Sequence, residues 1–364
     1  MSGRFRLPFD LRYDKHLVAA LLAFSVVSVF VLYSASGRNL SAVGSQVARY
    51  VFAFIVMFAI AQVRPETMRR YSPHIFGIGL ISLLAVLIAG EIGKGAQRWL
   101  SLGLLNVQPS ELMKLAVPMV LSWWVARDGI PPRARTLAIG GVLIVVPVFM
   151  IYKQPDLGTA GMILASGLMV LFLAGISWKL IIGAIIALTA AAPMVWAHML
   201  DYQRARVMSF LNPQSDPLGA GYHSIQSMIA VGSGGIFGKG WLDSSQAHLG
   251  YLPERTTDFV FAVFAEEFGL LGVLLLFSLY AFLIGRCMLI AYYAQDAYSR
   301  LLAGALALTF FLYFFVNIGM VTGILPVVGV PLPLISYGGS SLVTLLAGFG
   351  ILMSIQTHRR IVQH

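Results

Sequence analysis

An aspartate stands where a long polar stretch of the chain gives way to an apolar one. Asp258 follows residues 201–257 and opens an apolar run that extends to Arg286. A carboxylate that enters a membrane span is costly unless it faces protein or water, so it marks a functional site by default. An ionised, partly desolvated carboxylate at such a boundary is suited to act as a general base. The structural alternative is that Asp258 caps the helix that follows it.

Lysines and arginines occupy the polar loops and span ends that we place on the same side of the membrane as Asp258. An arginine fork and a lysine ammonium are the usual protein partners of phosphate. Together with a general base, these cations predict a cleft that holds a pyrophosphate. The structural alternative is that each cation is solvated or anchors a span at the interface. The eight residues are Lys94, Arg98, Lys114, Lys153, Arg204, Arg206, Lys239 and Arg255.

Further carboxylates lie within or beside the apolar runs. Glu111 and Lys114 are three residues apart, so a helix places them on one face. Their pairing is compatible with a structural ion pair and with a functional role. Glu266 and Glu267 lie deeper in the run that Asp258 opens, and they point about 100° apart on a helix. We interpret these two glutamates as polar contacts inside the protein.

Several common types of site are excluded by the sequence. The seven histidines form no HxxxH or HExxH spacing, so no zinc site is expected. Cys287 is the single cysteine, which rules out a disulfide within the chain. Residues 232–240 are rich in glycine and contain Lys239, but their spacing is not that of a P-loop, and we predict a flexible turn. The net charge of +10 lies in loops between spans, which favours an anionic lipid-linked substrate over nucleic acid.

The elements that position these residues are membrane helices. The chain is 58% hydrophobic and 11% charged, with a mean hydropathy of +0.82, which is typical of an integral membrane protein. We predict an all-α, polytopic fold that forms one membrane domain over residues 1–364. The predicted spans are Leu17–Ala35, Tyr50–Val63, His74–Gly90, Leu112–Ala126, Thr136–Tyr152, Leu157–Ala174, Leu180–His198, Asp258–Arg286, Leu301–Thr322 and Ser341–Gln356.

The orientation of the spans follows from the short basic loops. Loops 64–70 and 127–135 are rich in arginine, and the positive-inside rule places such loops in the cytoplasm. Both termini are then cytoplasmic, and the loop 201–257 is extracytoplasmic. Between the last two spans, residues 323–333 contain prolines and glycines that break the helix. Irregular backbone at membrane depth requires surrounding protein or a watery cavity, and it leads here to Ser336 and Ser340, which we predict to contact substrate.

These residues resemble the SEDS family of bacterial shape, elongation, division and sporulation proteins, typified by RodA, FtsW and SpoVE. The resemblance extends in register from Gly95 to the C-terminus and is closer to the RodA branch. Residues 1–90 match by hydropathy alone. The matching stretches are Gly95–Leu100, Gln108–Lys114, Lys153–Gly158, Gln203–Arg206, Asn212–Pro213, Asp216–Tyr222, Leu252–Phe259, Glu266–Gly269 and Pro331–Ser341.

The resemblance implies a peptidoglycan glycosyltransferase in the bacterial inner membrane, acting in cell elongation and shape. Its substrates would be lipid II and a glycan linked to undecaprenyl pyrophosphate. Its partner in the elongation machinery would be a class B penicillin-binding protein, the transpeptidase. The acid that is essential throughout the family matches Asp258, and an important glutamate matches Glu111. A divalent cation, Mg²⁺ or Mn²⁺, is compatible with the family, although the sequence shows no metal cage.

The mechanism that we predict needs a base and a cationic pocket. Asp258 takes the proton of the acceptor GlcNAc 4-hydroxyl while undecaprenyl pyrophosphate departs, by analogy with inverting glycosidases. Glu111 is predicted to hold Lys114 in place. Two alternatives remain open: a flippase that moves lipid II across the membrane through broken helices, and a non-catalytic activator of the penicillin-binding protein. The predicted phosphate-binding residues are Arg98, Lys114, Lys153, Arg204, Arg206 and Arg255.

Overall fold

The computed structural model describes residues 13–93, 96–101, 106–199, 204, 207–208, 210, 221–252 and 254–358. Within these residues ten long helices correspond one to one with the ten predicted spans, which confirms the all-α membrane fold. The helices are α1 (Lys15–Ala35), α2 (Leu40–Ala61), α3 (Pro65–Ala89), α4 (Pro109–Asp128), α5 (Ala134–Lys153), α6 (Leu157–Leu173), α7 (Trp178–His198), α11 (Val260–Tyr292), α12 (Ala297–Val321) and α13 (Ser340–Thr357).

Seven of these helices, α1, α2, α3, α5, α11, α12 and α13, are long and apolar enough to cross a membrane. The second helix is longer than the hydropathy pattern alone indicates. It begins at Leu40, where the side chain of Asn39 accepts hydrogen bonds from the amides of Ser41 and Ala42. This N-cap extends α2 ten residues before the predicted start at Tyr50, so Arg49 lies inside the helix.

A small antiparallel sheet joins α3 to α4, and the sequence analysis did not predict it. Its strands are β1 (Glu91–Gly93), β2 (Ala96–Ser101) and β3 (Asn106–Val107), in the order β1-β2-β3. Hydropathy distinguishes spans from loops, but it carries no signal for strands this short. The all-α class is unaffected, since the sheet lies in a connection between two helices.

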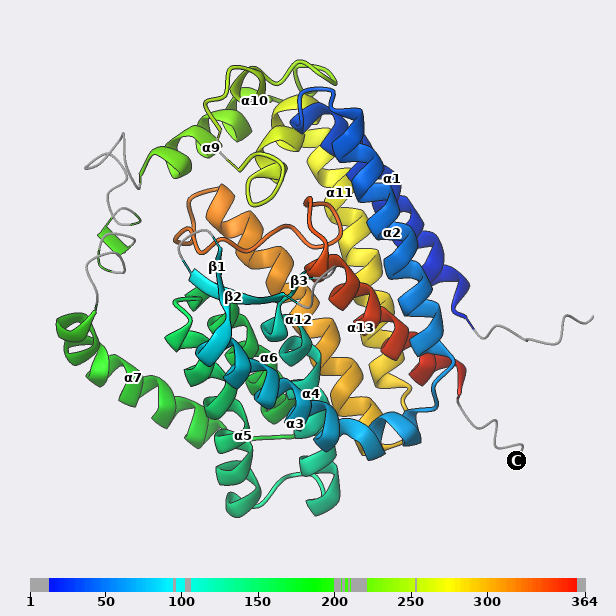
Figure 1. Cartoon of the computed structure of the whole chain (residues 1–364), viewed down its shortest axis with the longest axis vertical. Coiled ribbons are helices and arrows are strands. Elements are labelled where there is room, and N and C mark those ends of the chain that lie inside the picture. The colour runs from blue at the N-terminus through cyan, green and yellow to red at the C-terminus, as the bar shows by residue number, and fades with distance from the viewer. Residues whose placement is uncertain are drawn as a thin grey trace, which may run out of the picture.

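Two short helices, α9 (Tyr222–Ser233) and α10 (Ser245–His248), cover one end of the bundle, and the α4–α5 connection lies at the opposite end (Figure 1). Helix α9 lies within the loop 201–257 and is packed against the bundle. Its buried face packs on α11 and α12, and the Ser227 hydroxyl donates to the Val321 carbonyl at 2.9 Å.

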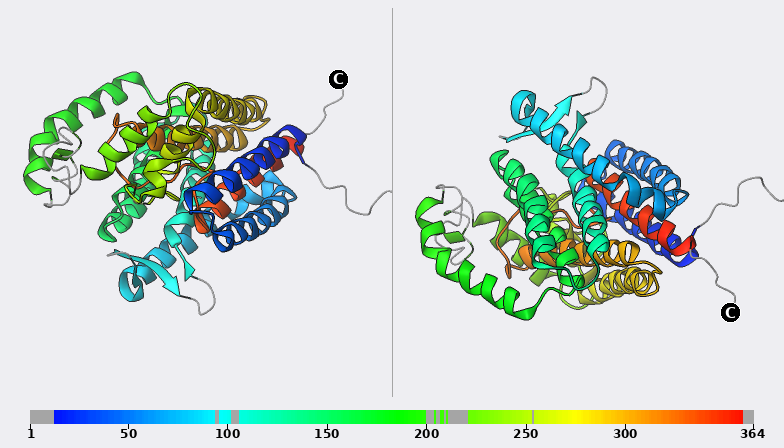
Figure 2. Two further views of the ribbon diagram at one scale, coloured as in Figure 1. Left: turned by 90° about the horizontal axis from the view of Figure 1, so that it is seen from above. Right: turned by 90° about the horizontal axis from the view of Figure 1, so that it is seen from below.

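Helix α7 differs from the other long helices because it leaves the bundle. In Figure 1 and in both views of Figure 2 it curves along the outside of the molecule. Most of its side chains are exposed, including Trp178, Ile186 and Met194. An apolar helix with exposed side chains is suited to contact lipid.

Helix α11 is interrupted by Gly269, whose φ of 61° and ψ of −164° are not helical. The interruption frees two carbonyls before it and two amides after it. The loop 234–240 pairs with all four groups, as buried backbone requires. The amides of Lys239 and Gly240 donate to the Glu266 and Glu267 carbonyls at 3.0 and 3.1 Å, and the Leu270 and Leu271 amides donate to the Gly235 and Ile236 carbonyls at 2.9 and 3.1 Å.

Residues 234–237 form a turn, as predicted, and backbone hydrogen bonds hold the loop 234–240 against α11. The glycines are needed because two backbones meet. A Cβ on Gly238 would lie 2.1 Å from the Glu267 carbonyl oxygen, and one on Gly269 would lie 2.2 Å from the Gly238 amide nitrogen. The Lys239 and Gly240 amides, which a P-loop would offer to phosphate, are used by α11 instead.

We expect Gly238→Ala to lower the thermal stability of the protein. The new Cβ would collide with backbone atoms, and the φ of +80° at residue 238 is unfavourable for any residue with a side chain. We therefore expect the free energy of unfolding to fall by about 1–3 kcal/mol. Gly232→Ala is the matched control, since nothing lies within 4 Å of a Cβ there. Melting temperatures of the two variants in detergent provide the measurement. Equal values would show that the loop is not held against α11.

Candidate active site

The segment between α12 and α13, residues 322–339, is irregular, as predicted, and we call it the buried loop. Its carbonyls are satisfied by side chains from four different helices, which is how non-helical backbone persists at membrane depth. Ser28 of α1 donates to Ile335 at 2.8 Å, Tyr280 of α11 to Pro333 at 2.5 Å and Asn317 of α12 to Val330 at 2.7 Å. From α2, Gln46 donates to Ser336 at 3.3 Å, and Tyr50 donates to Leu334.

The turn that carries Asp258 is attached to the buried loop. Tyr337 donates its amide to the Thr256 carbonyl at 2.8 Å. The Ser336 hydroxyl donates to the Thr257 carbonyl at 2.5 Å and accepts from the Leu332 amide at 2.8 Å. Ser336 was predicted to contact substrate, and the structure gives its hydroxyl a supporting role between two backbone segments.

Asp258 itself precedes the N-cap of α11, which is Phe259, so the structural alternative of a capping aspartate is not what the fold shows. Its carbonyl accepts from the Asn317 amide group at 2.9 Å. Asn317 is fully buried and also bonds Val330. A Cβ on Gly329 would lie 3.4 Å from Asp258 Oδ2. Asp258 is therefore held on a rigid support, with its carboxylate close to a glycine of the buried loop.

A cavity lies beside this turn, between α4, α12, α13 and the buried loop. Its walls are mostly apolar. Its polar side chains include Glu111 and Lys114, which form an ion pair at 2.6 Å, and the Lys114 ammonium lies 5.3 Å from the centre of the Tyr313 ring. Three polar atoms on its walls, Glu111 Oε2, Thr309 Oγ1 and Tyr313 Oη, are buried without a hydrogen-bond partner. Such atoms mark a place where a ligand or water is expected.

Asp258 is not among the residues that line this cavity, but Ser336 connects the two features. Ser336 forms part of the cavity wall and donates to the residue before Asp258. Ser341, which follows the predicted substrate residue Ser340 at the start of α13, also lines the cavity. Ser336 thus contacts both the cavity and the turn that carries Asp258.

The other predicted cations are not gathered in the cavity. Lys153 is exposed, with its ammonium 5.4 Å from the centre of the Phe149 ring. Arg204 donates to the Trp196 and Ala197 carbonyls at the end of α7, at 3.2 and 2.8 Å. Arg255 reaches the turn after α1, where its Nη2 is 3.9 Å from a Cβ built on Gly37.

Three of the eight predicted cations are not placed by the structure. Arg98 belongs to strand β2, but its side chain lies outside the described residues. Lys94 and Arg206 also lie outside them. Of the predicted cations whose side chains are described, Lys114 is the one that lines the cavity.

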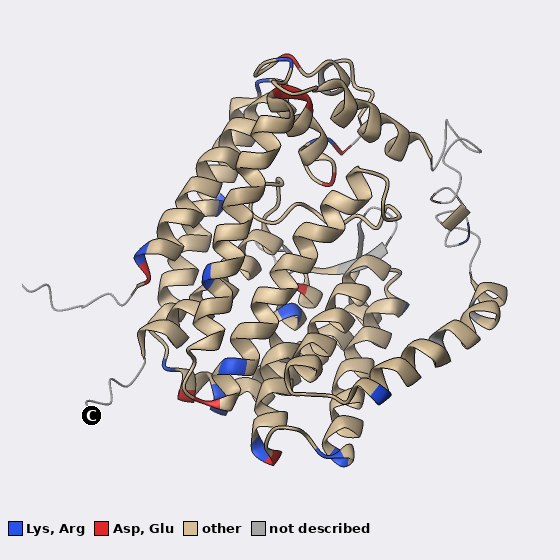
Figure 3. Ribbon diagram, turned by 180° about the vertical axis from the view of Figure 1, so that it is seen from behind, with Lys and Arg blue, Asp and Glu red and all other residues tan. Residues whose placement is uncertain are grey.

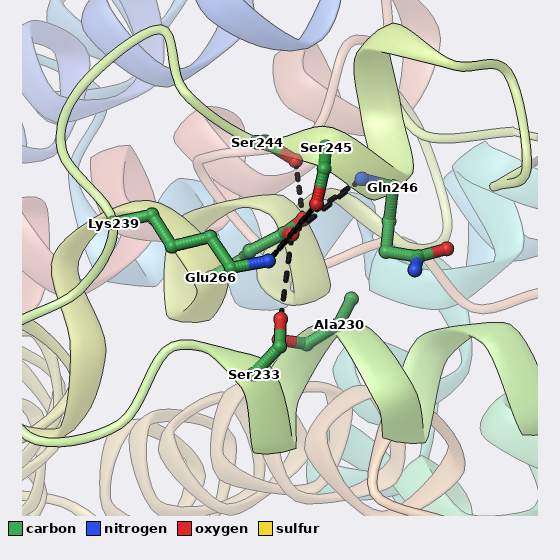
Figure 4. Close-up of polar contacts among 7 residues, drawn as sticks. All are labelled: Ala230, Ser233, Lys239, Ser244, Ser245, Gln246 and Glu266. Carbon is green, nitrogen blue, oxygen red and sulfur yellow. Dashed lines mark hydrogen bonds and ion pairs between the residues drawn. The ribbon is translucent and has the colours of Figure 1, made fainter.

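Glu266 and Glu267 are buried and hydrogen-bonded inside the protein, as predicted. Glu266 is the centre of a polar cluster shown in Figure 4, in which Lys239 bonds its carboxylate at 2.6 Å and Ser244 at 2.5 Å. The Ser245 and Ser233 hydroxyls add bonds at 2.8 and 3.3 Å. Glu267 accepts from the Ser34 hydroxyl of α1. Lys239, one of the eight outer cations, is thus the counter-ion of Glu266.

Sequence reasoning missed the residues that contact the buried loop, among them Asn317 and Arg49. Asn317 is a polar residue within an apolar span, which is itself a signal of function or packing. Arg49 lay outside the predicted span that begins at Tyr50, but α2 begins earlier and places Arg49 against Tyr337. In the described residues no three His, Cys, Asp or Glu side chains come together as a metal site. We therefore derive no step through Mg²⁺ or Mn²⁺.

Comparison with known proteins supports a single family. A family model described as "Cell cycle protein" for FtsW, RodA and SpoVE matches residues 14–361. The peptidoglycan glycosyltransferase MrdB of Escherichia coli K12 is 50% identical over 350 residues, which cover 96% of this chain and 95% of that protein. The probable peptidoglycan glycosyltransferase FtsW of Trichlorobacter lovleyi is 35% identical over 366 residues, with 96% and 95% covered.

Solved structures support the same family. A chain from a peptidoglycan synthase complex that coordinates polymerization and crosslinking superposes with a TM-score of 0.84 at 31% identity, covering 96% of this chain and 100% of that one. The rod-shape-determining protein RodA of Thermus thermophilus has a TM-score of 0.73 at 28% identity, covering 97% and 100%. The chain therefore belongs to the FtsW, RodA and SpoVE family of cell cycle proteins, also known as the SEDS family.

Proposed function

We propose that this chain, a peptidoglycan glycosyltransferase, polymerises lipid II at the site formed by Asp258 and the Glu111–Lys114 cavity. The observation that carries the proposal is the attachment of the Asp258 turn. Three successive carbonyls, those of Thr256, Thr257 and Asp258, accept hydrogen bonds from the buried loop and α12. A carboxylate on so fixed a support, one residue from the wall of the cavity that holds the Glu111–Lys114 pair, has the preorganisation that catalysis requires.

The chemistry of chain extension matches these groups. The oxygen of an acceptor sugar hydroxyl forms a bond to the anomeric carbon of the donor, and the bond from that carbon to the lipid pyrophosphate breaks. Asp258 receives the hydroxyl proton as general base. The pyrophosphate leaves with the electron pair of the broken bond, and Lys114, positioned by Glu111, stabilises its charge. The hydroxyl at the 4-position of GlcNAc is the acceptor that we expect.

The orientation that we propose places α9, α10 and Asp258 on the extracytoplasmic side and both termini in the cytoplasm. It rests on the positive-inside rule. Figure 3 shows Lys and Arg gathered at the end of the bundle opposite α9 and α10, where the arginine-rich loops 64–70 and 127–135 lie. In this orientation the cavity and Asp258 meet lipid II on the outer leaflet.

The comparison with solved structures supports a partner that crosslinks the glycan. The similar chain with a TM-score of 0.84 comes from a complex that coordinates polymerization and crosslinking. We propose a class B penicillin-binding protein, the transpeptidase of the elongation machinery, as the partner of this chain. The alternative of a flippase depended on Glu266 and Glu267 as polar groups along a path, and both bond to other residues of the chain.

The test is glycan synthesis from purified lipid II by this chain with its partner, after the transpeptidase serine of the partner has been replaced. We expect glycan strands on a gel, since the remaining polymerase is this chain. A parallel reaction with Asp258→Asn in place of the wild-type chain controls for polymerisation by the partner. Strands from neither mixture, or equal strands from both, would contradict the proposal and favour a flippase or a non-catalytic activator.

A further inference from the structure

Arg49 of α2 is a half-buried cation with no counter-ion among the described residues. Its guanidinium carbon lies 4.2 Å from the centre of the Tyr337 ring. Its Nη1 atom is buried and has no hydrogen-bond partner, and none of the ion pairs among the described residues includes it. Leaving a desolvated guanidinium unpaired is costly. The stacking on Tyr337 compensates only part of that cost, so the arrangement calls for an anion.

The N-terminus of α13 faces the same point. Gly339 is its N-cap and supplies no side-chain hydrogen bond, which leaves the first-turn amides of this 18-residue helix available. Such amides attract anions. A Cβ on Gly339 would lie 3.6 Å from Arg49 Nε, so the guanidinium is in contact with the helix end. The hydroxyls of Ser340 and Ser341 lie in this first turn.

Neighbouring residues fix Arg49 in this position. Gln46 and Tyr50, which lie one turn apart on α2 on either side of Arg49 in sequence, both donate to carbonyls of the buried loop, those of Ser336 and Leu334. The residue under the guanidinium, Tyr337, donates its amide to Thr256, two residues before Asp258. Arg49 and the α13 N-terminus therefore belong to the same rigid unit as the proposed base.

We propose that Arg49 and the first turn of α13 bind a phosphate group of the lipid-linked substrate. This inference rests on the proposed function and adds a binding residue that the predicted set of cations does not contain. A guanidinium fork and a row of backbone amides together match the oxygens of a phosphate. Arg49 is nine residues from the start of α2, roughly 14 Å along the helix axis at 1.5 Å per residue. Because Arg49 lies within a candidate membrane span, we expect an anion that reaches it to be carried by a lipid.

The primary measurement is the kinetics of lipid II polymerisation by Arg49→Gln. Losing charge-assisted hydrogen bonds is expected to lower kcat/KM for lipid II by about 10- to 100-fold. Arg49→Lys should retain part of the activity, because it keeps the charge and loses the fork. Arg38→Gln is the matched control, since Arg38 is an exposed arginine near the start of the same helix. Unchanged kinetics for Arg49→Gln would overturn the proposal.

A second measurement does not depend on catalysis. Farnesyl pyrophosphate, a soluble lipid pyrophosphate, should raise the melting temperature of the wild-type protein and of Arg38→Gln, but not that of Arg49→Gln. Farnesol is the control ligand without phosphate. If Arg49→Gln responds to farnesyl pyrophosphate as the wild type does, the inference fails even if the chain polymerises lipid II. If the wild type makes no glycan yet shows the Arg49-dependent shift, the proposed function fails and the phosphate site stands.

The phosphate of an ordinary phospholipid is the other source of the same chemistry. Nanodiscs of phosphatidylglycerol and of phosphatidylcholine separate the two sources. A substrate site predicts that Arg49→Gln loses the response to farnesyl pyrophosphate equally in both membranes. If the only effect of Arg49→Gln is a loss of stabilisation by phosphatidylglycerol, with the lipid II kinetics unchanged, Arg49 binds a phospholipid phosphate. The substrate assignment is then overturned.

Discussion

Asp258→Asn is expected to slow lipid II polymerisation by about 10²–10⁴-fold, the usual contribution of a general base. The amide has nearly the shape of the carboxylate but cannot accept the proton. The contacts that hold the turn are made by backbone carbonyls of Thr256, Thr257 and Asp258, which the substitution leaves in place. The variant should therefore fold with a melting temperature close to that of the wild type.

Initial rates of glycan formation from purified lipid II give the measurement. Asp243→Asn is the matched control, because Asp243 is an exposed aspartate in the same outer loop. It makes the same change of charge and should leave the rate unchanged. A wild-type rate for Asp258→Asn would remove this residue from the catalytic role, and the base would have to be sought elsewhere.

Replacing both members of the Glu111–Lys114 pair is expected to preserve stability but not activity. The two side chains are only 10% and 14% exposed, so Lys114→Met leaves a carboxylate buried without its cation. Breaking such a pair from one side typically costs about 3–5 kcal/mol. Adding Glu111→Gln removes the uncompensated charge, and the double variant should recover most of the lost stability.

The activity of the double variant distinguishes a structural pair from a catalytic one. If Lys114 stabilises the leaving pyrophosphate, the stable double variant should still polymerise lipid II far more slowly than the wild type. Thermal unfolding and initial rates, measured on the two single variants and the double variant, complete the cycle. Recovery of both stability and rate in the double variant would show that the pair serves packing alone.

Much of the fold could be predicted from the sequence because membrane helices are specified by local composition. Each span is a run of apolar residues, and each boundary carries charges, prolines or glycines. Start positions were less well defined where a cap lies within polar residues, as at Asn39. The sheet of residues 91–107 was missed because its strands are short and carry no hydropathy signal.

The candidate site was only partly predictable, since it depends on contacts between distant segments. Asp258, Glu111 and Lys114 have types and spacings that indicate chemistry by themselves. The contacts that hold these residues in place are not indicated by local sequence. The Ser28 side chain bonds the Ile335 carbonyl, and the Asn317 side chain bonds the carbonyls of both Asp258 and Val330. Local charge also failed to show which cations share a cavity. Lys153 and Arg204 lie near span ends as expected, but the directions of α5 and α7 take them elsewhere.

The interruption of α11 at Gly269 has a mechanical consequence. In the piece of α11 before the interruption, the carbonyls of Glu266 and Glu267 bond to the loop 234–240 instead of to the next turn of their own helix. A displacement of that loop would therefore move this short helical piece, and with it the turn of Asp258, which lies two residues before the helix begins. A protein that bound the loop would in this way shift the proposed base without touching it.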